Sequence, residues 1–555
     1  MNANRFLTVT GSALLAAGAL AAGHAFAALP GCTAGALSAL NVPSVTVTSA
    51  ADVAATATAP EYCHVLGSVA SPSGNPNGDG FSFDLPAGWN GRFLMGGGGG
   101  FTGSTNGPNV SALSQGYAVA STDTGHTVGN ATFAITAPHV RAEGAVIDYF
   151  YLAMHNVTVA GKQMTREFYK SPSIKYSYFQ GCSTGGRQAL MEARRYPEDF
   201  DGIIAGDAFS THHLVLEQLK GELALLQPGA YIPASLAPAI DAAVYAECDA
   251  KDGVKDSLIQ NPPACGFNPQ TIVCGAPGVS PSACLSQAQA DALKNYIRPI
   301  TTGDGHQVIP GYPITDLGGG DGMQIWFLGL TVPVSGSEPW GSPFGPPFSW
   351  SFADQTLKYL VYEDPNYDTF NFGMSPDGRI DGRSLELWDK MTRAGNADDP
   401  EALQPFLRKG GKLLIYHGFS DGGLSPYRTI DLYKELADRA GGYRDLQRDA
   451  RLFLVPGMHH CAGGPGPNVF DTLTPLQKWV ENGVAPDAIP ASHFTGTTVD
   501  RTMPLCKFPE QARYSGKGDV KNAANWSCPD HDRSLLHIGP NGAEAGLSAG
   551  EESDD

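Results

Sequence analysis

The residues Ile174 to Pro197, IKYSYFQGCSTGGRQALMEARRYP, carry the clearest chemical signal in the sequence. An apolar predicted strand runs into the glycine-rich turn Gly181–Gly185, and good helix formers follow without a proline until Pro197. This is the pattern of a nucleophile elbow, in which a strained turn lifts one hydroxyl clear of a sheet. The flanking glycines are needed because a Cβ atom there would collide with neighbouring backbone. The exposed hydroxyl would be that of Ser183, which could attack a carbonyl carbon.

The pattern G-x-S-x-G is weak by itself, because 68 glycines in 555 residues produce it easily and it occurs three times. Ser548 lies in an acidic segment without a preceding strand. Ser420 follows the predicted strand KLLIYHG, but Pro426 interrupts a helix that starts directly after it, and little chain remains for an acid and a base. Ser183 has the strand, the turn and the helix, with both partners still to come. We therefore predict Ser183 as the nucleophile.

A serine hydroxyl needs a base to accept its proton and an acid to hold that base in the correct tautomer. Asp421 lies in a glycine-rich turn after the predicted strand 411–418, and His459 and His460 follow the predicted strand 451–455. An acid and a base thus each come just past the end of a strand, in the order Ser, Asp, His that α/β-hydrolases use. The spacing alone leaves both histidines as candidates.

A run of five glycines, Gly96–Gly100, follows the predicted strand 91–95. The pattern Gly98-x-Gly100-x-x-Gly103 also matches the dinucleotide fingerprint, with Asp123 at the distance of a ribose-binding acid, which would indicate a nicotinamide-dependent dehydrogenase. The intervening TNGPNVSAL is too short and too rich in turn residues for the helix that this site requires. The better interpretation is one half of an oxyanion hole. The backbone amide of Thr184, the residue after the nucleophile, would supply the other half.

The order of the predicted elements favours an α/β fold, an α/β-hydrolase core with a large inserted lid (cap) domain. A long helix is predicted over 138–170 and a short strand over 202–206, whereas 210–398 combine four cysteines, an acidic loop and many prolines and aromatic residues. Aromatic residues there, including Trp326 and Phe352, either line a pocket for a planar ligand or form the core of the lid. The predicted parts are the hydrolase core in 28–209 and 399–540, the lid in 210–398, and an acidic flexible tail in 541–555.

Composition and charge limit the cellular location of the protein and the partners that it can bind. A formal charge of −19, with 36 scattered Lys and Arg, argues against nucleic acid and anionic membranes as partners. Residues 1–27 have a basic start, an apolar run and the small-x-small site Ala25-Phe26-Ala27, as in a secretory signal peptide. No later stretch is apolar for 18 residues, so we expect a secreted or periplasmic protein without a membrane anchor. The sequence leaves the oligomeric state open.

Ten cysteines in an exported chain predict up to five disulfides, although the sequence does not fix their pairing. Two of them, Cys182 and Cys461, adjoin the proposed nucleophile and His460. The other eight fall into local couples: Cys32 and Cys63, Cys248 and Cys265, Cys274 and Cys284, and Cys506 and Cys528.

On Cys182-Ser183, Asp421 and His460-Cys461, the chain resembles the tannase and feruloyl esterase family, from about Trp89 through Cys528. The family includes a hydrolase of mono(2-hydroxyethyl) terephthalate. The resemblance implies His460 rather than His459 as the base and the backbone amides of Gly100 and Thr184 as oxyanion donors. It also implies a bond between Cys182 and Cys461 and bridges within the four local couples.

The segment 249–258, DAKDGVKDSL, places the carboxylates of Asp249, Asp252 and Asp256 in one tight loop. Like charges this close repel unless a cation lies among them, and hard oxygen ligands suit Ca²⁺. A solvated acidic turn is the alternative from the residues alone. The resemblance implies a structural calcium ion, with the carbonyls of Val254 and Leu258 as further ligands.

We therefore expect a secreted carboxylic-ester hydrolase, in which Ser183, His460 and Asp421 cleave aromatic esters of the feruloyl or galloyl kind. A terephthalate-monoester hydrolase and a catalytically silent, calcium-stabilised binding protein are the alternatives. The terephthalate-monoester enzyme of the family grips the free carboxylate with a lid arginine, but this chain has no Arg between Arg298 and Arg379, where Lys358 is the sole cation. A small ester with a neutral or phenolic ring is the expected substrate, because an unpaired buried carboxylate is costly.

Overall fold

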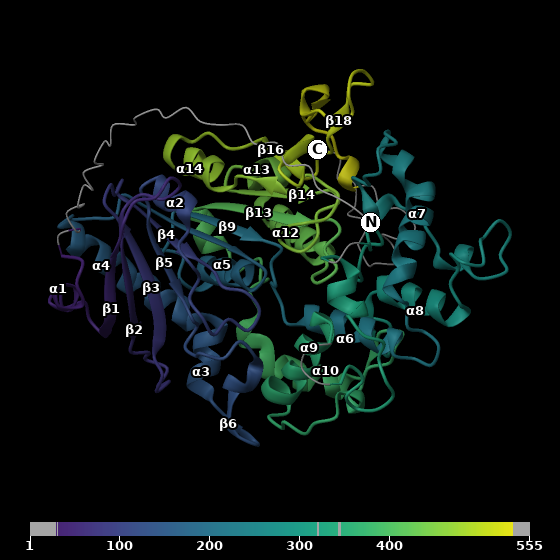
Figure 1. Cartoon of the computed structure of the whole chain (residues 1–555), viewed down its shortest axis with the longest axis horizontal. Coiled ribbons are helices and arrows are strands. Elements are labelled where there is room, and N and C mark those ends of the chain that lie inside the picture. Colours follow the sequence, from purple (N-terminus) through teal and green to yellow (C-terminus); the bar gives the residue numbers. More distant parts are fainter. Residues whose placement is uncertain (1–28, 30, 319–320, 342–345, 537–555) are drawn as a thin grey trace, which may run out of the picture.

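The computed structural model of the chain describes residue 29 and residues 31–318, 321–341 and 346–536. Within these residues, the largest sheet has nine strands in the order β1-β2-β3-β5-β4-β8-β9-β13-β14 (Figure 1). The strands are β1 (Val45–Val53), β2 (Tyr62–Val69), β3 (Asp79–Pro86), β4 (Arg92–Gly96), β5 (Ala118–Thr122), β8 (Tyr176–Cys182), β9 (Gly202–Gly206), β13 (Lys412–Gly418) and β14 (Ala450–Val455).

Most of this sheet is parallel. From β5 through β4, β8, β9 and β13 to β14, each neighbouring pair is parallel, whereas β1, β2 and β3 continue the sheet in antiparallel pairs. Parallel strands are covered on both faces, so the central ones are expected to be buried and mainly apolar. Every residue of β9, GIIAG, is buried. The topology confirms the predicted α/β class.

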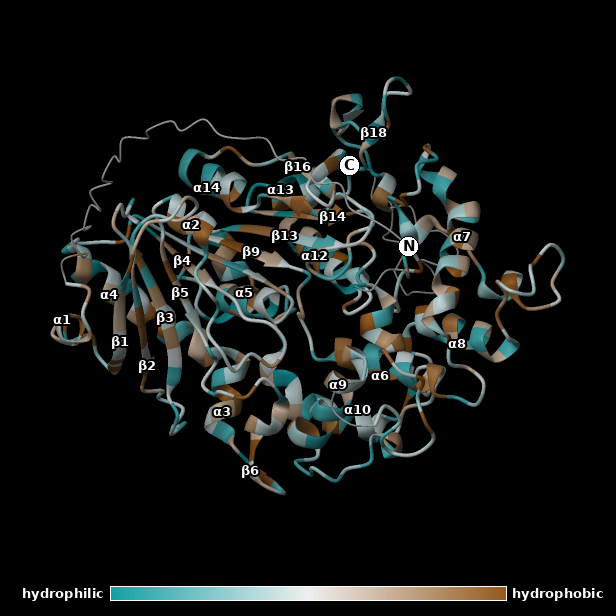
Figure 2. Ribbon diagram, viewed as in Figure 1, coloured by the Kyte–Doolittle hydropathy of each residue, from teal (hydrophilic) through white to brown (hydrophobic). Residues whose placement is uncertain are grey.

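Helices cover both faces of the sheet. The core on one face includes residues of α4 (Ala153–Tyr169), α5 (Thr184–Arg195) and α12 (Pro426–Ala440). The core on the other face includes residues of α2 (Val110–Ser114) and α14 (Leu473–Asn482). Figure 2 shows the hydrophobic colouring gathered on the strands between these helices, β9 and β13 among them.

The long helical region predicted over 138–170 is confirmed over 143–169, with one π-type turn inside it. A two-residue strand, β7 (Val140–Arg141), precedes α3 (Glu143–Ile147), and a wider π-type turn over Asp148–Leu152 joins α3 to α4. The side chain of Asp148 in this turn accepts hydrogen bonds from Ser71, Ser73 and Asn75. The prediction from helical periodicity missed the turn because these partners lie far away in the sequence.

The segment predicted as the lid lies between β9 and β13, which are nevertheless neighbours in the sheet. It has apolar clusters of its own, separate from those of the large sheet, and lies beside the sheet in Figure 1. Its helices include α6 (His213–Leu225), α7 (Ala237–Cys248), α8 (Gln287–Ile297), α9 (Phe348–Gln355) and α10 (Gly382–Thr392), and its small sheet has the order β11 (Gln307–Ile309), β10 (Ile300–Thr302), β12 (Arg379–Ile380).

The predicted disulfides are confirmed. All ten cysteines are bonded, in the pairing that the resemblance implied. Such a set of bonds is typical of proteins that fold in an oxidising compartment. No helix in the described ranges is both long enough and apolar enough to cross a lipid bilayer. The predicted signal peptide, 1–27, and the predicted tail, 541–555, were assigned on sequence alone and lie outside the described residues.

The contact between α5 and the sheet is testable at Gly186, where an added Cβ would lie 2.4 Å from the carbonyl oxygen of Gly206. We expect Gly186→Ala to lower the free energy of unfolding by about 2 kcal/mol, because backbone must move to relieve the overlap. Gly382→Ala in α10 is the matched control, since a Cβ there meets nothing within 4 Å. Urea unfolding measures both variants, and equal midpoints would contradict the prediction.

Candidate active site

The turn after β8 has the strained geometry of a nucleophile elbow. Ser183 adopts φ 63° and ψ −124°, a conformation that costs a non-glycine residue roughly 1–3 kcal/mol. Its amide donates to the carbonyl of Gly206 over 3.0 Å, and its own carbonyl accepts from the amides of Arg187 and Phe209. These hydrogen bonds keep Ser183 in its strained conformation, directly before the first turn of α5.

The glycine run lies against this elbow. A Cβ on Gly185 would be 2.9 Å from the carbonyl oxygen of Gly98, so only glycine permits the approach. The carbonyl of Gly100 accepts hydrogen bonds from the hydroxyls of Thr184, over 2.8 Å, and Tyr149, over 3.2 Å. Gly100 is thereby fixed beside Thr184, the first residue of α5, whose amide has no acceptor within the helix. The two predicted oxyanion donors are thus brought together at a helix N-terminus, which favours negative charge.

The predicted acid and base form a direct pair. The Nδ1 atom of His460 lies 2.7 Å from Oδ2 of Asp421, and Oδ1 of the same carboxylate accepts the amides of Gly423 and Leu424. Burial acts to raise the pKa of Asp421, but the charge of His460 and hydrogen bonds from the neighbouring histidines hold it far below its usual range. Burial acts to lower the pKa of His460, and Asp421 outweighs it, so this pKa is raised. The carboxylate therefore stays ionised and stabilises a protonated His460.

Two further buried groups, not anticipated from the sequence, support this pair. The Nε2 atom of His417 lies 3.0 Å from the carbonyl oxygen of Leu424 and 3.3 Å from Asp421 Oδ2. Asp207, whose pKa burial raises to about 7, accepts the amide of Gly418 over 2.9 Å. Asp207 directly follows β9, and His417 is the last residue but one of β13. The position at a strand's C-terminal end is also what identified Asp421 in the sequence.

The disulfide between Cys182 and Cys461 joins the elbow to the histidine loop, with 6.0 Å between their Cα atoms. Ser183 and His460 each adjoin one of these cysteines. Within the described residues no hydrogen bond links the Ser183 hydroxyl to His460. Such bonds often tighten only when a substrate is bound.

The competing candidates have other partners. The Nε2 atom of His459 donates to the carbonyl of Asp316 over 3.0 Å, and the Ser420 hydroxyl donates to the Asp316 carboxylate over 2.6 Å. Asp123, the candidate ribose-binding acid, accepts the amides of Gly80 and Gly125 inside the fold. Ser548 lies outside the described residues.

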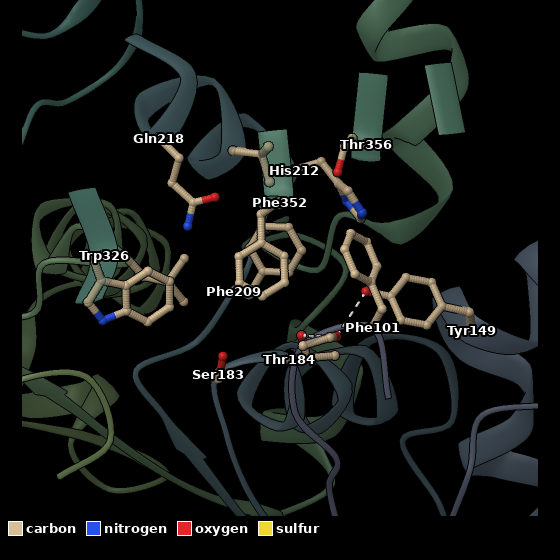
Figure 3. A pocket seen from close by; sticks show the side chains of 13 residues that line it. Phe101, Tyr149, Ser183, Thr184, Phe209, His212, Gln218, Trp326, Phe352 and Thr356 are labelled. Atoms are coloured by element: carbon tan, nitrogen blue, oxygen red, sulfur yellow. Dashed lines mark hydrogen bonds between the residues drawn. The ribbon is translucent and has the colours of Figure 1, made fainter. Parts of the chain in front are cut away.

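Beside Ser183 lies a pocket, which Figure 3 shows. Both aromatic residues predicted to bind substrate line it. Trp326 stacks on Phe352 with 6.2 Å between ring centroids and meets the His460 ring edge-on at 4.9 Å. Other aromatic residues of the lid segment, such as Trp340 and Trp350, are buried. The two interpretations of the lid aromatics thus each hold for part of the set. Phe101, Tyr149 and Phe209 complete the aromatic lining.

In the acidic loop 249–258, Asp249, Asp252 and Leu258 are buried, whereas the other residues are half-buried or exposed. Asp249 accepts the amides of Asp256 and Ser257, and Asp252 accepts those of Val254 and Gln260. Burial raises the pKa of Asp252 to about 7, and the neighbouring carboxylates add to that rise. Carboxylate and carbonyl oxygens are the kind of ligand that Ca²⁺ takes in proteins, although Asp249, Asp252 and Asp256 are not among the described groups whose ligand atoms already converge on one point.

One charge of this loop already has a partner. Arg501 binds the carboxylate and the carbonyl of Asp256. The negative charge that a cation would compensate therefore resides on Asp249 and Asp252, at 3% and 9% exposure.

The chain is similar to known proteins over most of its length. The family model described as Tannase and feruloyl esterase matches residues 63–529. The chain is 32% identical over 551 residues to the mono(2-hydroxyethyl) terephthalate hydrolase of Piscinibacter sakaiensis, with 86% of each chain covered. It is 32% identical over 465 residues to a probable feruloyl esterase of Arthroderma benhamiae, with 80% of this chain and 81% of that protein covered.

Solved structures show the same fold. Feruloyl esterase B from Aspergillus oryzae superposes with a TM-score of 0.74 at 25% identity, covering 89% of this chain and 98% of that one. Tannin acyl hydrolase from Aspergillus niger gives a TM-score of 0.71 at 22% identity, covering 91% and 97%. The predicted α/β-hydrolase fold is confirmed, and the chain belongs to the tannase and feruloyl esterase family of carboxylic ester hydrolases.

Proposed function

We propose that the protein is an exported serine esterase that cleaves aromatic esters of the feruloyl or galloyl kind through Ser183, His460 and Asp421. The observation that carries this proposal is the buried Asp421–His460 hydrogen bond, tied by the Cys182–Cys461 disulfide to a strained serine elbow. A binding protein would have no need for a strained serine beside an oriented histidine. That argues against the silent alternative.

In the proposed reaction, Ser183 Oγ attacks the ester carbonyl carbon and its proton passes to His460 Nε2. Asp421 holds the proton on Nδ1 and stabilises the imidazolium, while the amides of Gly100 and Thr184 bind the negatively charged oxygen. The carbon–oxygen bond to the alcohol then breaks, and the alcohol takes the proton from His460. Water, deprotonated by His460, attacks the acyl-enzyme and releases the aromatic acid and the serine.

The charge of the pocket supports a neutral or phenolic ring. None of its described lining residues is Lys or Arg. Lys358, the sole cation of the interval 299–378, forms ion pairs with Asp354 over 2.9 Å and Glu338 over 3.0 Å, so its charge is already compensated. A second carboxylate on the acyl group would lack a partner here. The relative named as a terephthalate-monoester hydrolase keeps that substrate as the second candidate.

We predict a pH profile governed by His460. A protonated base cannot accept the serine proton, so kcat/KM should fall on the acid side of the His460 pKa, which Asp421 raises above its ordinary value of about 6.5. Asp421→Asn should lower kcat by roughly 10⁴-fold and move this limb to lower pH. Initial rates on methyl ferulate between pH 4 and pH 9 measure both effects.

Ser183→Ala is the reference variant for that series, and a fluorophosphonate that labels the wild type should not label it. A profile unchanged by Asp421→Asn, or full activity of Ser183→Ala, would refute the assignment.

The disulfide gives a further prediction. Replacing Cys182 and Cys461 by alanine should lower kcat by about 10²-fold, because a shift of about 1 Å between Ser183 and His460 misaligns the reacting atoms. Replacing Cys506 and Cys528, which are bonded to each other and adjoin neither Ser183 nor His460 in the sequence, is the matched control and should change thermal stability more than kcat. Equal effects of the two double variants on kcat would contradict a positioning role.

We also propose that a calcium ion is held by Asp249, Asp252 and Asp256 with the carbonyls of Val254 and Leu258. Chelation should lower the melting temperature by about 5 °C, because bound ligand stabilises the folded state. Asp252→Asn should remove this response, whereas Asp530→Asn, at a side chain 82% exposed, should retain it. Melting curves indifferent to chelator and purified protein without calcium would refute the site.

A further inference from the structure

The amide of Gln218, on α6, has a fixed orientation at the pocket. Its Nε2 donates to the carbonyl oxygen of Gly423 over 2.9 Å, and the Tyr312 hydroxyl donates to the same oxygen over 3.0 Å. A carbonyl oxygen only accepts, so the NH₂ end of the amide must face Gly423. Oε1 is then directed away from Gly423. Figure 3 shows the Gln218 amide pointing into the pocket that it lines.

This Oε1 atom has no hydrogen-bond partner within the described residues, although Gln218 is only 1% exposed. A buried acceptor without a donor costs free energy, and native structures retain few of them. An orphaned acceptor at a pocket wall therefore indicates that the ligand supplies the donor.

A second acceptor, His212, lines the same pocket. The backbone amide of His212 donates to Asn396 Oδ1 over 2.8 Å, which identifies that oxygen as an acceptor. His212 Nδ1 lies 3.3 Å from the same oxygen and so carries the ring proton. The lone pair is left on Nε2.

The charge state of His212 follows from its surroundings. Burial, with a contribution from the charge of Arg187, lowers its pKa well below the ordinary value. Arg187 is fully buried beneath the pocket, with its Cζ atom 5.9 Å from the Phe209 ring centroid. His212 is therefore a neutral imidazole and, through Nε2, an acceptor.

We propose that Gln218 Oε1 and His212 Nε2 are the acceptors of a site for ring hydroxyls, each able to accept a hydrogen bond from one phenolic hydroxyl of the acyl ring. Figure 3 shows Ser183 on one side of the pocket and Gln218 and His212 on the other, with the rings of Phe209 and Phe352 between them. An acyl group with its carbonyl at Ser183 would extend its ring toward the acceptors. A hydroxyl can donate to them, whereas a methoxy group or a carboxylate offers only lone pairs.

This inference rests on the proposed function and narrows it to rings with a free hydroxyl. We expect kcat/KM of the wild type to be roughly 10- to 100-fold higher for methyl 4-hydroxycinnamate or methyl 3-hydroxycinnamate than for methyl cinnamate, because the latter leaves the acceptors unpaired. Methyl 4-methoxycinnamate and the terephthalate monoester should be no better than methyl cinnamate.

The variant Gln218→Met tests the site directly, because methionine keeps the length of the side chain without the amide oxygen. The ratio of kcat/KM for the better hydroxycinnamate to that for cinnamate should fall toward one. Gln227→Met is the matched control, because Gln227 follows α6, lies outside the pocket lining and donates to the Leu223 carbonyl. This variant should keep the wild-type ratio of kcat/KM on the two esters. If Gln218→Met does not fold, the wild type can be tested with the free acids as competitive inhibitors. 4-Hydroxycinnamate should then have a lower inhibition constant than cinnamate.

The outcomes separate the two proposals. Equal kcat/KM on the hydroxylated, methoxylated and unsubstituted esters overturns the acceptor site and leaves the proposed esterase intact. A ratio that survives in Gln218→Met also overturns it. Failure to hydrolyse any aromatic ester overturns both.

Discussion

The site depends on keeping a carboxylate ionised where water does not reach it. Asp421 is 1% exposed, and an isolated charge at that depth would take up a proton. Two backbone amides and two imidazoles surround it: the amides belong to the turn after β13, one imidazole lies in β13 itself and the other follows β14. The pairing with that charge orients His460, whose loop the Cys182–Cys461 disulfide joins to the elbow.

The elbow is likewise an unfavourable state that its surroundings stabilise, here a strained backbone conformation. Ser183 is strained, and the strain persists because β9 and α5 fix the peptide groups on either side. The glycine run then packs closely enough for Thr184 and Tyr149 to bond Gly100. The sheet, the helix and the loop thus fix the relative positions of Ser183, Thr184 and Gly100. Electrostatic stabilisation of a developing charge requires such fixed groups.

Sequence reasoning found the groups that follow the ends of strands. Ser183, Asp421 and Thr184 came from strand–turn patterns, because parallel strands deliver their C-terminal ends to one edge. The choice of His460 over His459 and the role of Gly100 needed the family resemblance, since adjacent residues share the same local pattern. Gln218 and His212 were missed. Their roles depend on which atom of each side chain is already bonded, and the partners, Gly423 and Asn396, are about 200 residues away.

The insertion between β9 and β13 has a consequence for when the chain becomes active. The serine precedes the lid segment, the acid and the base follow it, and the bond that joins the two halves spans 279 residues. Almost the whole chain must be synthesised before the two halves can meet. Since this bond forms only under oxidising conditions, a chain still in a reducing compartment carries both halves of the site without the link between them. Under the positioning role proposed for this disulfide, catalytic competence would depend on an oxidising compartment.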